Sequence, residues 1–503
     1  MKYIYIIFFL SISHFLVAQD KVWVSSYNSS PNTDSKFGLS SLKFTHDSVE
    51  LISVLPQNMD LIIFASPNCS ISDSLDNLLF YSNGLAIFNA QHDTMQNSKG
   101  FNNGVYIDDN DKSFGVVQTV LALPHPKLNY LYYLFHSVPE IYGSAVQPNS
   151  LKYSVIDMRL DSGRGAVIEK NVPIINDWIC KGYITACKHA NGKDWWILTP
   201  KLQQGAYYRT LFTGDSIYPP IKQVIGPAGS AFQGGFARFS QDGSTYFLHD
   251  DTNAANSKIQ IYDFDRCTGL LSNLRILTVP VISQEWLYGI STSPNSRYLY
   301  INGSNRIFQY DLKSQDISAS QQIVANYDGY ICSFPPNPQT FGQSGFYWSQ
   351  IGPDDKIYIC SFGMTNVYHV IDYPDSAGLA CHVRQHGIAF PTFMDFSIPN
   401  FPNYRLGESP LQCYGVAVQD EIRNKEITVY PNPATQRIYL ASTSIQGKAE
   451  IAIYNALGQE VYRENAVFSG QEKAISIQNL PQGAYYLRIF AENEVLQAKF
   501  FKE

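Results

Sequence analysis

A strand–turn–strand unit recurs along most of this chain, and this recurrence limits its fold more than any other sequence feature. The clearest copy spans residues 236–263, where two apolar strands flank a Gln-Asp-Gly-Ser turn and an alternating third strand ends in Asp. Copies of the same form span residues 288–311 and 348–372. Weaker copies begin at Cys69, Val116 and Ile184. Six copies at intervals of roughly 45–70 residues predict an array of β-meanders.

Each unit presents flat faces that need covering, and its turn reverses the chain. Neighbouring units arranged in a ring cover these faces and remove exposed strand edges. The content of 34 Tyr and 30 Phe also favours pleated, half-buried surfaces. We therefore predict an all-β protein whose main domain, residues 20–412, is a β-propeller. Seven blades are favoured and six are the alternative; the seventh would combine residues 395–399 with strands at 42–45 and 49–54.

The N-terminus has the pattern of an export signal. Lys2 precedes an apolar run over residues 4–17, and the short residues around Ala18 and Gln19 fit a signal peptidase site. We expect residues 1–19 to be a signal peptide, and no later stretch is apolar enough for a transmembrane segment. The net charge of −7, without clustered Lys and Arg, argues against nucleic acid as a partner.

Eight cysteines follow this signal, and an exported protein passes through an oxidising compartment in which disulfides form. Their spacing is irregular, so it defines no disulfide framework. Cys180 and Cys187 are the pair that we expect to be joined. For the remaining cysteines, buried free thiols are an equal alternative.

Four stretches of the repeat region resemble a family of exported, propeller-like proteins from Bacteroidetes that often carry gliding or secretion sorting domains. These stretches are residues 73–84, 188–196, 352–358 and 398–403. The resemblance covers most of residues 60–405 and implies a propeller in a cell-surface setting. That family carries no agreed activity, so the resemblance implies none for this chain.

A second domain follows a short polar linker at residues 413–425. Residues 426–503 contain alternating apolar patterns, typical of half-buried strands, and Gly-containing turns at residues 457–458 and 482–483. The chain ends in a basic, aromatic segment at residues 499–502. This pattern predicts a small seven-stranded β-sandwich.

The order of these signals resembles the type IX secretion system sorting domain (type A). The matching motif residues are Tyr430, Pro431, Asn432, Pro433, Asn455, Gly458, Gly483, Tyr485 and Lys499. The resemblance implies recognition by the type IX translocon at the outer membrane and then removal by a peptidase near residues 419–426. It also implies that the mature protein is secreted or held at the cell surface, often by attachment to surface polysaccharide.

Candidate metal and cofactor sites are weak in this sequence. Residues 108–111 are acidic but lack the glycine and distal glutamate of an EF-hand loop. Cys381, His382 and His386 have no second cysteine pair at zinc-finger spacing. A nucleophile elbow, a phosphate loop and a paired-histidine zinc motif are also missing from the sequence. We therefore predict no catalytic residue, no metal and no cofactor.

Two sets of side chains remain as candidates for binding or for structure. Trp195 and Trp196 are adjacent in a strand, so their side chains should point to opposite faces. One of them could stack on a ligand, although blade packing of both is favoured. Strand-terminal acids occupy equivalent places in the repeat, which favours turn capping over catalysis. These acids are Asp157, Asp263, Asp311 and Asp372.

The sequence leaves three functions open. The favoured one is a non-catalytic propeller that binds an extracellular glycan or protein through loops of the ring. The alternatives are a propeller enzyme acting on extracellular polysaccharide, whose acids would gather at the central channel, and a structural adhesion protein. Convergent carboxylates in the channel would favour the enzyme. An apolar channel, with exposed aromatic side chains elsewhere, would favour the binder.

Overall fold

The chain divides into two compact units, Met1–Cys413 and Tyr414–Glu503. The expected signal peptide lies outside the described residues, and Cys413, expected in the linker, falls in the first unit. The computed structural model describes residues 20–26, 37–45, 48–54, 64, 67–103, 118–137, 139–143, 145–227, 235–250, 257–282, 285–332, 342–361, 363–395, 397–409, 413, 428–441, 446–455, 460–469, 472–491 and 495–503.

The described residues of the first unit form seven sheets of three or four strands. The first sheet contains β1 (Val22–Ser26), β2 (Leu39–Phe44) and β3 (Val49–Val54). The second contains β4 (Cys69–Ser72), β5 (Leu78–Ser82) and β6 (Ile87–Asn89). The third contains β7 (Val120–Pro124), β8 (Leu131–His136), β11 (Leu151–Asp157) and β12 (Ala166–Ile175).

Four further sheets have four strands each. The fourth contains β13 (Thr185–Lys188), β14 (Trp195–Pro200), β15 (Ala206–Phe212) and β16 (Ile221–Val224). The fifth contains β17 (Ala237–Phe239), β18 (Thr245–Asp250), β19 (Lys258–Phe264) and β20 (Leu271–Thr278). The sixth contains β21 (Leu287–Thr292), β22 (Tyr298–Gly303), β23 (Arg306–Asp311) and β24 (Gln322–Asn326). The seventh contains β25 (Phe346–Ile351), β26 (Ile357–Ser361), β27 (Thr365–Ile371) and β28 (Val383–Met394).

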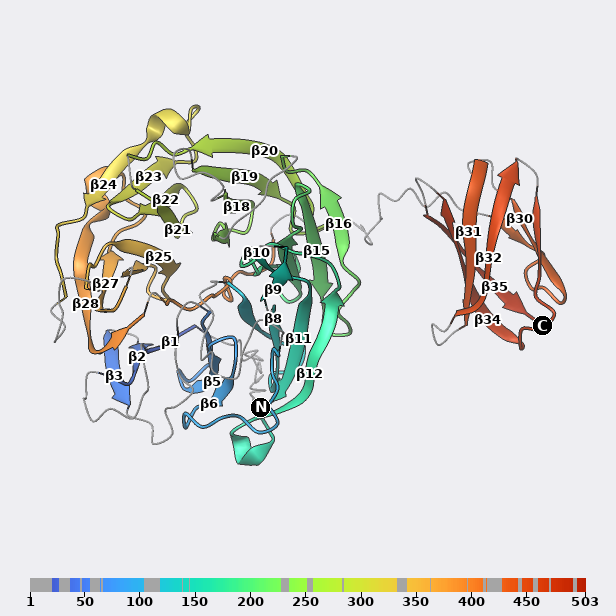
Figure 1. Cartoon of the computed structure of the whole chain (residues 1–503), viewed down its shortest axis with the longest axis horizontal. Helices are drawn as coiled ribbons and strands as arrows, with labels where there is room; N and C mark the ends of the chain where they lie inside the picture. The colour runs from blue at the N-terminus through green and yellow to red at the C-terminus, as the bar shows by residue number, and fades with distance from the viewer. Residues whose placement is uncertain are drawn as a thin grey trace, which may run out of the picture. The chain divides into compact units, whose positions relative to one another are not determined.

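These sheets are antiparallel meanders arranged in a ring, with the later strands of the four-stranded sheets at its outer rim (Figure 1). The third sheet differs from the others because the hairpin of β9 (Pro139–Tyr142) and β10 (Ala145–Pro148) is inserted between β8 and β11. The first unit is a β-propeller. That each of the seven sheets is one blade, and that the propeller therefore has seven blades, stays a prediction.

The closing sheet of the ring differs from our expectation. Strands β1, β2 and β3 form the first sheet by themselves, and the described residues among 395–399 carry no strand. The expected strands at 42–45 and 49–54 therefore pair as β2 and β3, whereas the expected contribution of residues 395–399 is not seen among the described residues. The physical reason is that the long edge strand β28 packs directly against the first sheet. The first and seventh sheets therefore meet where the ring closes. The chain after β28 then runs into the interior of the ring.

A left-handed residue recurs in the turn between the first and second strands of five sheets. Backbone conformation in this region costs most L-residues about 1–2 kcal/mol, and Gly, Asn and Asp tolerate it best. The residues are Asp76 (φ 62°), Gly192 (φ 69°), Gly243 (φ 71°), Ser296 (φ 58°) and Asp355 (φ 63°). The sequence repeat is therefore also a repeat of backbone conformation.

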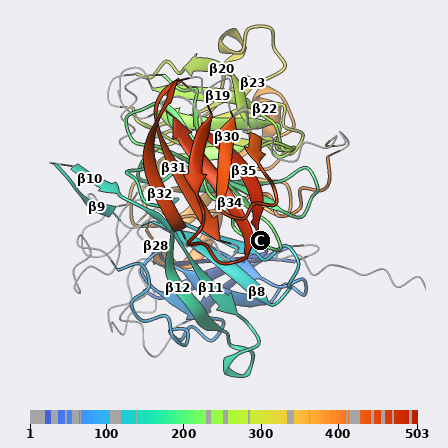
Figure 2. The same cartoon turned by 90° about the vertical axis from the view of Figure 1, so that its right-hand side faces the viewer.

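The second unit is a sandwich of two sheets. One sheet contains β29 (Thr428–Tyr430), β30 (Arg437–Ala441) and β33 (Lys473–Ser476). The other contains β32 (Glu460–Ser469), β31 (Gln446–Asn455), β34 (Gly483–Ala491) and β35 (Val495–Lys502), which lie side by side in Figure 2. Apolar side chains of both sheets, such as Ile438, Ile451 and Leu487, share one core.

Candidate functional site

The segment after β28, residues 397–409, enters the interior of the ring; we call it the axial segment. Its Asn400 is 4% exposed. Asn400 Nδ2 donates to the carbonyl oxygens of Val120 at 3.1 Å and Ile184 at 3.0 Å. Asn400 Oδ1 accepts a hydrogen bond from Gln118 Nε2 at 3.2 Å. One side chain therefore satisfies backbone groups of both the third and the fourth sheets.

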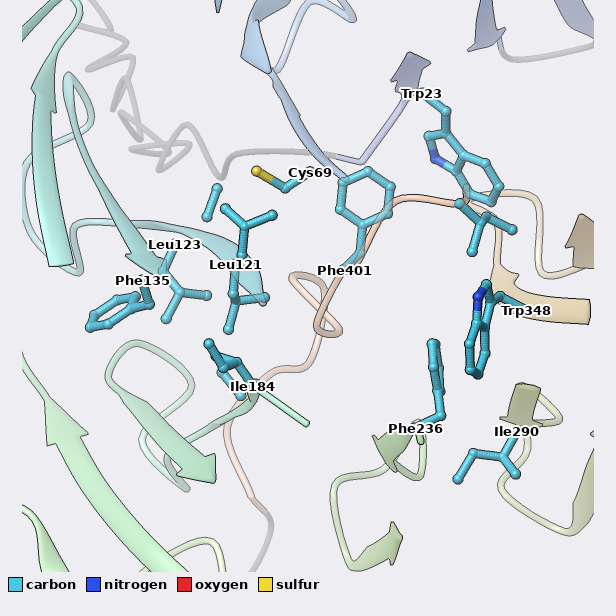
Figure 3. Close-up of a cluster of buried hydrophobic side chains, with 14 of the residues drawn as sticks. Trp23, Cys69, Leu121, Leu123, Phe135, Ile184, Phe236, Ile290, Trp348 and Phe401 are labelled. Carbon is cyan, nitrogen blue, oxygen red and sulfur yellow. The ribbon is translucent and has the colours of Figure 1, made fainter. Parts of the chain in front are cut away.

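Apolar side chains surround the axial segment. The ring of Phe401 lies 5.8 Å from that of Trp23, and Phe236 stacks on Trp348 at 5.1 Å. Figure 3 shows these rings together with Leu121: Trp23, Trp348 and Leu121 lie on strands of different sheets, Phe236 precedes β17, and Phe401 lies on the axial segment. All of these side chains are buried. Much of the centre of the ring is therefore packed with apolar side chains, although the charged side chains of Asp20, Arg238 and Arg405 line a small cavity there.

Both candidate stacking tryptophans are buried, with Trp195 1% and Trp196 0% exposed. Trp196 Nε1 donates to the Arg266 carbonyl oxygen at 3.0 Å, and the ring of Trp195 meets the ring of Tyr404 at 5.9 Å. Strand β14 is covered on both faces, so side chains that point in opposite directions both pack. Neither indole presents a face to a ligand, and both side chains pack inside the propeller.

An open groove of about 500 Å³ lies between the third and fourth sheets; we call it the aromatic groove. Its walls come from β8, β11, β12 and the turns beside them, including the connection from β15 to β16. The ring of Tyr133 lies 5.5 Å from Tyr153 and 4.6 Å from Phe212. His125 and Tyr218 also line the groove, and Tyr218 is 49% exposed.

Ionisable groups are sparse in the aromatic groove. Asp215 is the one carboxylate among the described lining residues, and it pairs with Lys127 at 2.5 Å. Burial, and then the Glu169 carboxylate, raise the pKa of Tyr133 and of Tyr153 above the usual tyrosine value. Both phenols therefore stay protonated at physiological pH, and the Tyr153 hydroxyl donates its hydrogen to the Glu169 carboxylate.

Two turns hold one end of the aromatic groove. His125 Nδ1 accepts the backbone N–H of Lys127 at 3.1 Å, which orders the turn after β7. In the turn after β15, the Thr213 hydroxyl accepts the backbone N–H of Asp215 at 3.2 Å. A Cβ at Gly214 would lie 2.2 Å from Lys127 Cγ, so a larger residue there would require the Lys127 side chain to move. The groove is thus built by the fold before any ligand arrives.

Sequence reasoning missed the aromatic groove. Its lining comes from separate segments near residues 125–133, 153, 172–174 and 212–220. The available signals were the Tyr-rich strand β8 and the Tyr-Pro-Pro run at 218–220. Both also occur in ordinary blades and turns, so neither marks a site until the fold brings the segments together.

The weak metal candidates do not form a site. The described residues contain no group of three or more His, Cys, Asp or Glu side chains arranged to hold a metal ion. Cys381 is buried, and the imidazoles of His382 and His386 pair with different carboxylates, at 2.9 and 3.4 Å. Residues 108–111 lie outside the described part of the chain.

The expected disulfide is wrong. Cys180 and Cys187 both remain thiols, buried in one apolar cluster. Burial raises the pKa of the Cys187 thiol to about 12, which disfavours the thiolate needed for disulfide formation. The disulfide joins Cys267 to Cys413 instead, across 146 residues. It ties the end of the first unit to the turn between β19 and β20.

The strand-terminal acids are structural. Asp157 and Asp311 each accept a hydrogen bond from the backbone N–H two residues later, at 2.9 and 3.0 Å, so they cap turns as expected. Asp263 and Asp372 instead pair with an arginine on the next strand, at 2.6 and 3.0 Å. All four carboxylates are engaged within their own sheets, which leaves none of them as an isolated acid.

The second unit holds its proline-containing turn against its last strand. Asn432, between the exposed Pro431 and Pro433, accepts the backbone N–H of Phe501 at 2.8 Å through Oδ1. Asn432 Nδ2 donates to the Lys499 carbonyl oxygen at 3.2 Å. This turn therefore covers the outer edge of β35, which would otherwise be a free strand edge.

Other motif residues of the second unit are mostly structural. Tyr485 is 3% exposed, stacks on Phe500 at 5.5 Å and lies opposite Asn455 in the sheet. Tyr430 stacks on Tyr439, and Gly483 begins β34. Lys499 Nζ lies outside the core, 5.0 Å from the ring of Phe501. Gly458 lies outside the described residues.

Residues 428–503 match the family model described as the secretion system C-terminal sorting domain. The second unit is a sorting domain. Its presence indicates export by the type IX system, to the cell surface or beyond it. Within the described part of the chain, no helix is long and apolar enough to span a membrane.

No curated protein matches the chain. Among solved structures, a functionally unknown protein from Desulfotomaculum acetoxidans is 12% identical, with TM-score 0.35, over 76% of this chain and 99% of that one. The Myceliophteria thermophila Swd1 β-propeller domain is 10% identical, with TM-score 0.34, over 65% and 88%. A quinonprotein alcohol dehydrogenase-like protein from Bacteroides thetaiotaomicron is 10% identical, with TM-score 0.29, over 75% and 91%. The fold assignment rests on the sheet topology itself.

Proposed function

We propose that this protein is a non-catalytic, glycan-binding β-propeller that its sorting domain delivers to the outside of the cell. The aromatic groove carries the proposal. Its volume of about 500 Å³ falls in the range of small-molecule sites, roughly 300–1,000 Å³. Such sites combine apolar and aromatic walls with a few polar groups that fix orientation, and the groove has this composition.

The chemistry of the groove fits a sugar better than a charged ligand. A pyranose ring has C–H faces that pack on aromatic rings and a rim of hydroxyls that needs hydrogen bonds. Tyr153 and Tyr218 supply aromatic surface for the faces. The tyrosine hydroxyls and Asp215 supply donors and acceptors for the rim. Because β8 and β11 already hold the walls, binding costs little ordering of the protein.

Two features support binding rather than hydrolysis. Glycoside hydrolysis ordinarily uses two carboxylates on either side of the scissile bond. The described lining of the aromatic groove has one, Asp215, and Lys127 already pairs with it. The centre of the ring, where a propeller enzyme would gather its acids, is largely occupied by the axial segment and its apolar neighbours. Among the described residues that line the small cavity left there, Asp20 is the one acid, and it pairs with Arg405.

The test uses residues 20–503, the chain without its expected signal peptide, and a panel of insoluble polysaccharides. Retention of protein and release of soluble sugar are scored together. We expect retention without release, and we expect Tyr153→Ala and Tyr218→Ala each to weaken retention roughly tenfold, or about 1.4 kcal/mol. The matched control is Tyr373→Ala, because Tyr373 is 62% exposed but lies outside the groove.

The outcomes separate the alternatives. Sugar release that persists in purified protein would support the enzyme and overturn the proposal. Equal retention of all three variants would show that the polysaccharide binds outside the aromatic groove. If no polysaccharide retains the protein, a protein ligand or an adhesion role replaces the glycan.

A further inference from the structure

Arg238 is a buried cation with no carboxylate partner among the described residues. It lies on β17 and is 7% exposed. Its Nη1 donates to the Phe401 carbonyl oxygen at 3.0 Å and its Nη2 to the Ser349 carbonyl oxygen at 2.9 Å. The guanidinium carbon also lies 4.4 Å from the centre of the Phe236 ring. The two carbonyl oxygens accept hydrogen bonds from the guanidinium, but no carboxylate among the described residues balances its positive charge.

The charge persists under physiological conditions. Burial lowers the pKa of Arg238 to about 9, and even this value keeps the guanidinium protonated at neutral pH. An uncompensated charge in an interior is costly, because the attraction of water is lost. A negative charge beside Arg238 would therefore stabilise the folded state.

A cavity of about 30 Å³ lies where that charge is needed, at the centre of the ring. Arg238 lines it, and so does Thr292, which is 1% exposed and whose Oγ1 has no hydrogen-bond partner within the described part of the chain. The other charged lining residues are Asp20 and Arg405, which form an ion pair at 2.5 Å. Two arginines and one aspartate leave one net positive charge around the cavity.

We propose that this cavity binds one small monovalent anion, of the size and charge of chloride, between the Arg238 guanidinium and the Thr292 hydroxyl. A volume of about 30 Å³ admits one or two water-sized occupants, which excludes larger oxyanions. The anion neutralises Arg238 and accepts the hydrogen of the Thr292 hydroxyl. It thereby stabilises the junction of β17, β21 and the axial segment.

The experiment is thermal unfolding of residues 20–503 in sodium chloride and in sodium gluconate at equal ionic strength. Gluconate is too large for the cavity. We expect a midpoint roughly 3 °C higher in chloride, because a ligand that binds only the folded state stabilises it. Thr292→Val and Arg238→Met should each remove most of this difference. Thr199→Val is the matched control, since Thr199 is equally buried with an unpartnered Oγ1 but lies outside the cavity.

The pattern across the variants decides the proposal. A chloride response that is lost in Thr292→Val and kept in Thr199→Val supports it, and a bromide peak in anomalous scattering beside Arg238 supports it directly. The proposal fails if the native chain responds equally to both salts. It also fails if Thr292→Val responds as strongly as the native chain, because the effect would then be a general effect of salt. Should Arg238→Met not fold, the comparison of Thr292→Val with Thr199→Val still distinguishes these outcomes.

Discussion

Replacing Asn400 by alanine tests whether the axial segment stabilises the ring. The substitution removes the two hydrogen bonds that Asn400 Nδ2 donates and leaves the buried carbonyl oxygens of Val120 and Ile184 without that donor. A buried polar group left unsatisfied costs about 1–3 kcal/mol. The small cavity left by the truncated side chain adds to this cost. We therefore expect Asn400→Ala to lower the free energy of unfolding by about 3–5 kcal/mol.

Urea unfolding followed by tryptophan fluorescence measures this loss. All 6 tryptophans of the chain precede residue 413, so the signal reports on the first unit alone. For a domain of this size, a loss of about 4 kcal/mol lowers the urea midpoint by about 1 M. The control is Asn403→Ala, in the same segment but partly exposed, with one donated bond to Gln241. We expect this control to lower the midpoint by roughly 0.3 M.

Equal midpoints for Asn400→Ala and the native chain would refute the reasoning. They would mean that the ring is held by its sheets alone and that the axial segment only rests inside it. A fall in Asn403→Ala as large as that in Asn400→Ala would also refute it, because the effect would then come from any change in the segment rather than from the buried amide.

Three further measurements test other features of the first unit. Asp355→Gly should raise the free energy of unfolding by about 0.5–1 kcal/mol, because Asp355 is exposed at φ 63°; an unchanged urea midpoint would contradict this. Burial lowers the pKa of His136 and His369 from 6.5 to about 3. Between pH 3 and pH 6.5 the unfolded chain binds protons at these histidines that the folded chain does not bind. The free energy of unfolding, measured with urea, should therefore fall by about 2 kcal/mol per histidine from pH 7 to pH 5, and equal values at both pH values would reject this prediction. Cys413→Ser should cost about 2–5 kcal/mol, because the bond to Cys267 closes a loop of 146 residues; a native urea midpoint would reject this.

The blade strands could be predicted from the sequence because the signals that define them are local. Alternation along one strand and a turn such as Asp242–Gly243 act over a few residues, and the structure places strands on both sides of that turn. The same local rule alone would leave one of Trp195 and Trp196 exposed, whereas the favoured prediction, blade packing of both, agrees with their burial. The local rule assumes that one face of a strand is exposed, whereas β14 is covered on both faces by its neighbours in the ring.

The features that could not be predicted depend on residues far apart in the chain. Asn400 contacts Val120 across 280 residues, and no local pattern marks an asparagine as the one that enters the interior. The disulfide follows from the same return of the chain, which brings Cys413 to Cys267. The aromatic groove is equally non-local, because the turn at 213–220 meets Tyr153 only after two sheets have packed.

The order of these features along the chain separates delivery from binding. The axial segment and Cys413, which tie the end of the first unit to its sheets, both precede the sorting domain, whose first strand begins at Thr428. Removal of the sorting domain near residues 419–426, which its family resemblance implies, would therefore cut after the last closing contact. The disulfide at Cys413 would then hold the new C-terminus against the first unit and resist fraying. The disulfide and the axial segment therefore both lie on the N-terminal side of that cut and would stay with the first unit.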